Sequence, residues 1–225
     1  GFFNANLHDI IYKVIQTPLV GLGSGIWATL VAIFFVQFLW FFGLHGQILV
    51  NSVMDPIWNT LMLDNLEAYQ AGKHLPHIIS KSFMETFTVG LGGSGMTLAV
   101  VIIMAFILKK KMYKDVGRLA LGAGLFNVNE PVIFGLPIVL NATILIPWVL
   151  APIVVTAFNY IVMAVGIVPA PTGVAVPWTV PVFFSGMLAT NSILGGVLQL
   201  VDMVIVGFIW YPFLRMLDKQ RDSVL

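Results

Sequence analysis

One carboxylate stands alone in the apolar second half of this chain. Glu130 is the only acidic or basic side chain between Arg118 and Asp202. An ionisable group at the centre of a membrane costs about 3 kcal/mol on insertion scales, so such a group is functional by default. Its oxygens can accept several charge-assisted hydrogen bonds from a polar guest. We therefore predict that Glu130 binds a polar substrate, and the alternative is a structural carboxylate that caps a helix.

Two amides and a proline surround this carboxylate. Asn127 and Asn129 precede Glu130, and Pro131 follows it directly. A proline favours an extended backbone in the residue before it and is itself a good first residue of a helix. The pattern predicts a broken helix that presents the three polar side chains to the guest, as in transporter substrate sites. The two amides are equally suited to bonding the free backbone groups of the break.

The composition is that of an integral membrane protein. Of the 225 residues, 59% are hydrophobic and 9% are charged, whereas a soluble domain carries about 25% charged residues. No basic patch with interleaved aromatic residues is present, so nucleic acid is not expected as a partner. Cysteine is absent, which excludes a disulfide, a thiolate metal site and a cysteine nucleophile within this chain. We expect the lipid bilayer to surround it.

Two patterns resemble a cofactor-binding motif and a metal site but lack the surrounding elements or ligands that such sites need. Gly90, Gly92 and Gly95 have the spacing of a dinucleotide-binding fingerprint, but no strand–turn–helix unit is predicted around them. His74 and His77 lie three residues apart, and a metal would need further ligands. We therefore predict no cofactor and no metal. The glycines are better explained as flexible backbone in a turn.

Apolar segments alternate with polar and glycine-rich ones, which predicts an all-α membrane protein. We expect three or four spanning helices, two re-entrant helical hairpins and an N-terminal interfacial amphipathic helix. Residues 1–23 are predicted to form that linker helix, and residues 24–225 the substrate-binding transmembrane domain. The chain begins at Gly1 without a methionine or a signal-peptide pattern and is interpreted as part of a longer protein. The apolar segments are 26–44, 96–108, 142–168 and 193–214, and the hairpins are placed at about 47–95 and 117–140.

Positive charge predicts the orientation of the chain. Five basic residues fall within the ten positions 109–118, and three more follow residue 214. Basic residues next to membrane segments are enriched on the cytoplasmic side. Both regions are therefore expected in the cytoplasm. Asp202, within the last apolar segment, is left with three interpretations: pairing with a basic group, capping a polar cavity, or facing a part of the protein outside this chain.

By its motifs, the chain resembles the membrane-embedded IIC component of bacterial sugar phosphotransferase systems, closest to the lactose, cellobiose and diacetylchitobiose branch. The most specific motif is FNVNEPVIFGLP at residues 126–137. Weaker support comes from GLHG at 43–46, the turn at 92–95 and the loop VPW at 176–178. The resemblance covers essentially the whole chain but only the C-terminal half of such a protein.

The resemblance implies a mechanism and partners. It implies a multi-pass protein of the bacterial cytoplasmic membrane that binds and translocates a disaccharide of the cellobiose or diacetylchitobiose type. A phosphocysteine on a separate IIB protein would phosphorylate the sugar, which fits the absence of cysteine here. The N-terminal half of the same permease would supply the remaining spans and much of a homodimer contact. As a permease subunit, the chain would not itself hold the phosphoryl-donating group.

The resemblance also assigns roles to candidate residues. Glu130 would bind sugar hydroxyls, and a further hypothesis is that it takes the proton of the hydroxyl being phosphorylated. His45 would be a second sugar contact, with a core histidine or a helix cap as the alternative. Trp178 would stack on a sugar ring, unless it is an interfacial belt residue. Trp40 is a weaker candidate for which packing is favoured, and Asn127 and Asn129 remain open between sugar and backbone.

Three rival functions are kept beside this one. The main rival is an ion-coupled secondary sugar transporter in which Glu130 is a proton site, and it would work without any phosphoprotein. An intramembrane enzyme or an oxidoreductase using the glycine turn is a second rival, and it would bind NADH. A purely structural membrane subunit is the third, and it predicts that replacing Glu130 alters stability but no ligand affinity.

Overall fold

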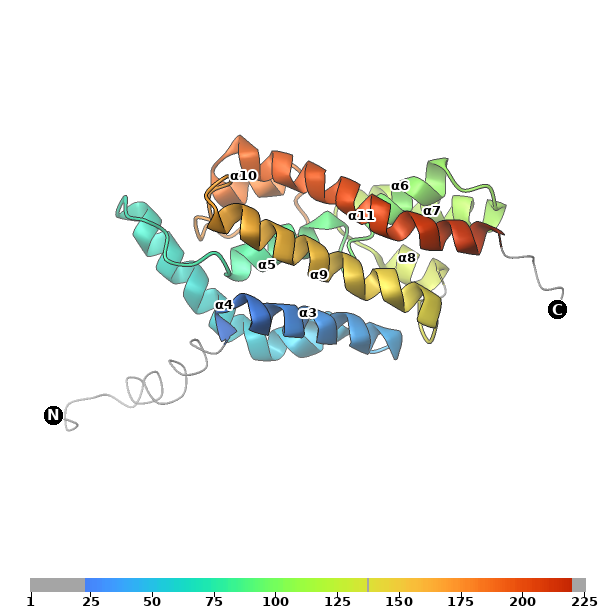
Figure 1. The fold of residues 1–225 in the computed structure, drawn as a ribbon, viewed down its shortest axis with the longest axis horizontal. Coiled ribbons are helices and arrows are strands. Elements are labelled where there is room, and N and C mark those ends of the chain that lie inside the picture. Colours follow the sequence, from blue (N-terminus) through green and yellow to red (C-terminus); the bar gives the residue numbers. More distant parts are fainter. Residues whose placement is uncertain (1–22, 137, 220–225) are drawn as a thin grey trace.

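The computed structural model describes residues 23–136 and 138–219 (Figure 1). The amphipathic helix predicted over residues 1–23 therefore lies, apart from Gly23, outside the described residues. Every regular element within the described ranges is helical. The all-α prediction is confirmed for this part of the chain.

Three apolar helices lie side by side, with α9 in the middle. They are α3 (Ile26–Phe41), α9 (Ala142–Ala164) and α11 (Ile193–Lys219), and α9 contacts both of the others (Figure 1). By length and composition, α9 and α11 are the two described helices able to cross a membrane, while α3 is a shorter apolar helix of 16 residues. All three coincide with predicted apolar segments.

Residues 47–95, predicted as one hairpin, begin with a long helix. Helix α4 (Gly46–Gln70) runs for 25 residues and packs against α3 and α5. It carries polar residues along one face, and this explains why no apolar run was visible in the sequence. After a loop come α5 (Lys81–Phe87), the short 3₁₀ helix η3 (Val89–Leu91), a glycine turn over residues 92–97, and α6 (Leu98–Phe106).

The helix break predicted around the Asn–Glu–Pro sequence is present. Helix α7 (Lys111–Leu125) ends before Phe126, and α8 (Glu130–Gly135) starts again four residues later, packed against α7. Glu130 was expected to be extended because a proline follows it. It instead opens α8, because the Asn129 carbonyl accepts hydrogen bonds from the Val132 and Ile133 amides at 2.9 and 3.0 Å.

Buried tryptophans fix the glycine turn against the long helices. The indole nitrogen of Trp210, on α11, donates to the Gly95 carbonyl at 3.3 Å. A Cβ at Gly95 would lie 2.4 Å from the ring of Trp148, on α9, so only glycine allows this contact. Trp148 and Trp210 are themselves in edge-to-face contact at 6.3 Å and are fully buried. The apolar core therefore holds the turn in place.

The two basic regions lie together in the fold. The backbone amides of Lys109 and Lys110 donate to the Asp218 carboxylate of α11 at 2.9 and 2.8 Å. The same carboxylate accepts a hydrogen bond from Arg215 at 3.3 Å. The loop between α6 and α7 and the end of α11 are thus at one end of the molecule. This agrees with the prediction that both face the same side of a membrane.

The last short helix is tied to the rest by one glutamine. Helix α10 (Phe184–Thr190) packs on α11, where the buried Gln199 accepts hydrogen bonds from the amides of Phe183 and Gly186 at 2.9 and 2.8 Å. The amide nitrogen of Gln199 donates to the Thr86 carbonyl of α5 at 2.8 Å. These bonds position the loop 165–183, which carries Trp178, relative to α5.

Candidate functional site

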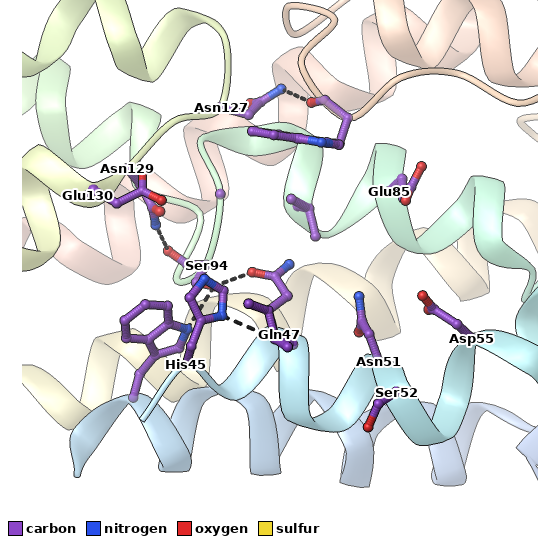
Figure 2. Close-up of a pocket in the computed structure, with 15 residues that line it drawn as sticks. His45, Gln47, Asn51, Ser52, Asp55, Glu85, Ser94, Asn127, Asn129 and Glu130 are labelled. Atoms are coloured by element: carbon purple, nitrogen blue, oxygen red, sulfur yellow. Dashed lines mark hydrogen bonds between the residues drawn. The ribbon is translucent and has the colours of Figure 1, made fainter. Parts of the chain in front are cut away.

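A cavity of about 560 Å³ lies between α4, the glycine turn, the helix break and the loop that carries Trp178 (Figure 2). All six residues predicted as substrate contacts line it. Their roles in binding remain predictions, but the structure brings them together from four separate parts of the chain. These residues are Trp40, His45, Asn127, Asn129, Glu130 and Trp178.

The glycine turn approaches the helix break so closely that it allows no side chain at Gly93. Gly93 has φ of +76°, and a Cβ there would lie 2.7 Å from Cγ of Asn129 and 2.8 Å from the Asn127 carbonyl. Glycine adopts such a positive φ without steric cost. The fingerprint-like glycine spacing therefore reflects turn geometry and close packing. The strand that a dinucleotide site requires is missing from the described residues.

Asn127 joins the glycine turn to the loop of Trp178. Its amide oxygen accepts a hydrogen bond from the Gly92 backbone amide at 2.8 Å. Its amide nitrogen donates to the carbonyls of Trp178 and Val180 at 2.6 and 3.1 Å. An amide nitrogen has two hydrogens, and both are used here. In this structure Asn127 therefore satisfies backbone groups, the second of the two roles predicted for it.

Asn129 and Trp40 hold Ser94 from opposite directions. Asn129 donates to the Ser94 carbonyl at 2.7 Å. The indole nitrogen of Trp40 donates to the Ser94 hydroxyl at 3.1 Å, and that hydroxyl donates to the side-chain oxygen of Gln47 at 2.5 Å. Trp40 is almost completely buried. The chain of bonds links α3, the turn and α4, so both predicted residues position the wall of the cavity.

His45 caps α4 and keeps one ring nitrogen free for the cavity. Its Nδ1 accepts a hydrogen bond from the Ile48 amide at 3.3 Å, and its ring lies 4.5 Å from that of Trp40. Because Nδ1 accepts, the neutral ring carries its hydrogen on Nε2. His45 can therefore donate one hydrogen bond to a guest while it caps the helix. The helix-cap alternative and the ligand role are compatible.

Glu130 and Trp178, like His45, are exposed, whereas the other predicted contacts are buried. Glu130 is exposed at the start of α8, and no residue of the described ranges forms an ion pair with it. Trp178 is 45% exposed, although it is a large aromatic residue lining a cavity. A free carboxylate and an uncovered indole are the groups expected where hydroxyls and apolar ring faces must both be bound.

Sequence analysis missed a polar stripe on α4. Gln47, Asn51 and Asp55 follow one another every four residues and line the cavity. Figure 2 shows all three pointing from α4 into it. Side chains four apart lie on one face of a helix, so this spacing was a usable signal. The stripe was not predicted, because its polar residues interrupt the apolar pattern by which helices are located and residues 47–95 were expected to form a hairpin. The remaining polar residues missed were Ser52, Glu85 and Ser94.

An ion triad borders the cavity at the end away from Glu130. The Lys81 ammonium contacts the carboxylates of Asp55 and Glu85 at 2.7 and 3.2 Å. Both carboxylates line the cavity, whereas Lys81 does not. In Figure 2, Glu130 and His45 lie toward one end, and Asp55 and Glu85 toward the other. The site is thus elongated, with carboxylates at both ends and amides between them.

Comparison with known proteins places the chain in a family. A family profile described as "Phosphotransferase system, EIIC" matches residues 1–152. The chain is 63% identical over 218 residues to the "PTS system oligo-beta-mannoside-specific EIIC component" of Bacillus subtilis, covering 97% of this chain and 49% of that protein. It is 42% identical over 219 residues to the "PTS system cellobiose-specific EIIC component" of Geobacillus stearothermophilus, covering 96% and 48%.

A solved structure has the same fold. The transporter ChbC, the IIC component from the N,N'-diacetylchitobiose-specific phosphotransferase system, superposes with a TM-score of 0.93 at 42% identity, over 96% of this chain and 50% of that one. The chain thus spans about half the length of the relatives it matches. The match and the two apolar helices make it an integral membrane protein. The chain belongs to the EIIC family of phosphotransferase-system membrane components.

Proposed function

We propose that this chain is the substrate-binding part of a phosphotransferase-system sugar permease, and that it binds a neutral β-linked disaccharide in the cavity beside Glu130. The observation that carries the proposal is the convergence of Glu130, the Nε2 of His45 and the Trp178 ring on one cavity of about 560 Å³. Ligand pockets of this kind commonly measure about 300–1,000 Å³. The proteins it resembles are named for cellobiose, oligo-β-mannosides and diacetylchitobiose.

The chemistry of the cavity suits a disaccharide. Three carboxylates and several amides supply acceptors and donors for hydroxyl groups, while Trp178 offers an aromatic face for a ring. Charged acceptors form the stronger hydrogen bonds. Glu130 and His45 at one end and Asp55 and Glu85 at the other would contact different rings of the sugar. We infer that Glu130 also accepts the proton of the hydroxyl that is phosphorylated.

We further infer how this chain sits in the complete permease. The pairs α5–α6 and α7–α8 would form re-entrant hairpins that meet at the cavity, because non-helical backbone at membrane depth must be buried or line a cavity. The glycine turn and the break at 126–129 are the non-helical segments in question. An N-terminal half would complete the scaffold and a homodimer in the bacterial cytoplasmic membrane. A phosphorylated IIB protein would donate the phosphoryl group.

Two measurements test this function. Purified permease, with the N-terminal half proposed above, is titrated with cellobiose, diacetylchitobiose and lactose, and one of these sugars is expected to bind. The permease is then placed in vesicles and supplied with that sugar, with and without phosphorylated IIB. Phosphorylated sugar inside the vesicles only when IIB is present is the expected result. Accumulation of free sugar without IIB, driven by an ion gradient, would contradict the proposal and support the ion-coupled rival.

A further inference from the structure

The cavity wall carries net negative charge. Three carboxylates line it, from Asp55, Glu85 and Glu130, and no lysine or arginine of the described ranges does. The Lys81 ammonium behind the wall contacts both Asp55 and Glu85. One positive charge against three negative charges leaves two in excess. The Lys81 side chain, 14% exposed, does not line this cavity but lines a smaller adjoining one that shares Glu85 and Asn51 with it.

The remaining polar groups of the wall do not offset this charge. His45 uses its Nδ1 to accept the Ile48 amide, which leaves only Nε2 to face the cavity. The N-terminus of a helix can attract an anion, and both α4 and α8 start at the cavity. However, the Ile48 amide of α4 is already bonded to His45, and the first turn of α8 already holds the Glu130 carboxylate. A dianion in this cavity would meet uncompensated negative charge.

We propose that the carboxylate wall formed by Asp55, Glu85 and Glu130 excludes sugar phosphates, so that the cavity binds the neutral disaccharide and cannot retain its phosphorylated form. This inference rests on the proposed function. A neutral sugar gains hydrogen bonds from the carboxylates, whereas a sugar carrying a phosphate dianion also meets their charge at close range. Phosphorylation would thus turn a sugar that the cavity binds into an anion that its carboxylates repel.

The test compares two sugars on one permease. Cellobiose and cellobiose bearing one phosphate on a primary hydroxyl are titrated calorimetrically into the full permease. The phosphorylated sugar is expected to bind weaker by roughly tenfold or more, the order expected for a dianion facing two charges across such a cavity. Raising the salt concentration should strengthen binding of the phosphorylated sugar and leave that of cellobiose unchanged, because salt screens charge repulsion.

Charge-neutral variants identify the residues responsible. Asp55→Asn and Glu85→Gln each remove one negative charge, and each should narrow the ratio between the two affinities by roughly threefold or more. Asp64→Asn is the matched control, since Asp64 is on the same helix but pairs with His77 outside the cavity. It should leave the ratio unchanged. If a variant fails to fold, the salt titration on the unmodified protein still tests whether charge repulsion weakens binding of the phosphorylated sugar.

Two results separate failure of this inference from failure of the function it rests on. If cellobiose binds and its phosphate binds equally well, or if salt and both variants leave the ratio unchanged, the charge-exclusion inference is overturned. If none of the neutral disaccharides binds to folded permease, the proposed function itself is contradicted.

Discussion

His45 has two roles that its two ring nitrogens can serve separately. Nδ1 caps α4 by accepting the Ile48 amide, and Nε2 is free toward the cavity. An imidazole is well suited to such a position because one nitrogen can accept while the other donates. Any substitution at His45 therefore has to be evaluated for the helix cap and for the ligand separately.

Two substitutions at His45 should separate these roles. Asn is a good helix cap, but its shorter side chain places no donor at the position of Nε2. His45→Asn should therefore keep stability, while sugar affinity should fall about tenfold, the order of one hydrogen bond to a ligand. His45→Ala should lose the same affinity and also about 0.5–1 kcal/mol of stability. Binding calorimetry and thermal unfolding in detergent measure both quantities. Unchanged affinity in His45→Asn would restrict His45 to the capping role.

Asn127 is predicted to act through the backbone groups it holds. Asn127→Ala leaves the Gly92 amide and the Trp178 and Val180 carbonyls without this partner. The expected loss is about 1–3 kcal/mol of stability, the cost of unsatisfied buried groups, together with weaker sugar binding because the loop of Trp178 is released. Asn59→Ala, on α4 and outside the cavity, is the control. A binding loss without any change in unfolding temperature would instead indicate direct contact with the sugar.

Some residues of the site could be predicted from the sequence, and others could not. Glu130 was visible because it is the one charge in a long apolar tract, and its neighbours drew attention through the Asn–Glu–Pro break. Whether Asn127 bonds sugar or backbone could not be decided, since its partners, Gly92 and Trp178, are 35 and 51 residues away. Asp55 and Glu85 gave no comparable signal, because both fall within residues 47–95, a mixed segment that also holds Asp64, Glu67 and Lys81.

At the scale of elements, the glycine turn and the helix break form one unit. The turn packs on the break with backbone-to-side-chain contacts on both sides: Asn127 to Gly92 and Asn129 to Ser94. Gly93 lies between them with a positive φ and no room for a Cβ. The position of Glu130 relative to His45 therefore depends on a close contact between two non-helical segments.

Gly93→Ala should disrupt this unit. A left-handed backbone costs an L-residue about 1–2 kcal/mol, and the added methyl group would also press on Asn129. We expect lower thermal stability and weaker sugar binding. Gly122→Ala is the matched control, because Gly122 lies in α7 with open space at its Cβ position. That change should stabilise the helix by about 0.5–1 kcal/mol, so equal effects from both substitutions would contradict the role given to the turn.

A buried polar pair links α9 and α11, the two described helices long and apolar enough to cross a membrane. The Asn159 amide of α9 donates to the Asp202 carboxyl of α11 at 2.9 Å, and both residues are fully buried. Asp202 was left with three interpretations; in this structure one of its carboxyl oxygens bonds Asn159 and the other, also buried, has no hydrogen-bond partner among the described residues. Four elements that pack on α11, namely α6, α9, α10 and η3, contain no lysine, arginine or histidine. Its described partner is thus an amide.

This pair can be tested by removing one member or both. Asn159→Leu should lower stability by about 1–2 kcal/mol, the scale of a hydrogen bond between membrane helices, because Asp202 stays buried without its donor. The double variant Asn159→Leu with Asp202→Leu should recover part of that loss, since neither polar group remains. Thermal unfolding in detergent is measured for the unmodified protein, the two single variants Asn159→Leu and Asp202→Leu, and the double variant, which together form a double-mutant cycle. If the double variant loses more stability than the two single variants lose together, Asn159 and Asp202 do not stabilise each other.

The sequence predicted elements according to how apolar they are. Helices α3, α9 and α11 were located because their residues are almost uniformly hydrophobic. Helix α4 was not recognised, because Gln47, Asn51 and Asp55 interrupt its apolar pattern to line the cavity. The same polar residues that line the cavity are therefore the reason why α4 was not predicted. The way α5 and α6 fold back could not be predicted, as it depends on Trp148 and Trp210 packing around Gly95.

At the scale of the whole molecule, a small apolar scaffold supports one elongated polar cavity. The core of α6, α9 and α11 holds the turn, the turn holds the break, and the break presents Glu130. Helix α4 closes the other side with its polar stripe. The α5–α6 and α7–α8 segments share the cavity with α4, and α5 also packs directly against α4. A movement of one part relative to another would change the shape of the cavity directly.

The most direct test of this account is sugar binding to the permease with and without the Glu130 carboxylate. Glu130→Gln keeps the shape of the side chain and removes its charge, so it replaces charge-assisted hydrogen bonds by weaker neutral ones. The disaccharide bound by the unmodified protein should bind to Glu130→Gln at least about tenfold more weakly, a difference of about 1.4 kcal/mol, while the unfolding temperature stays unchanged. Unchanged affinity, or a loss of affinity that follows a loss of stability, would contradict the claim that Glu130 contacts the sugar.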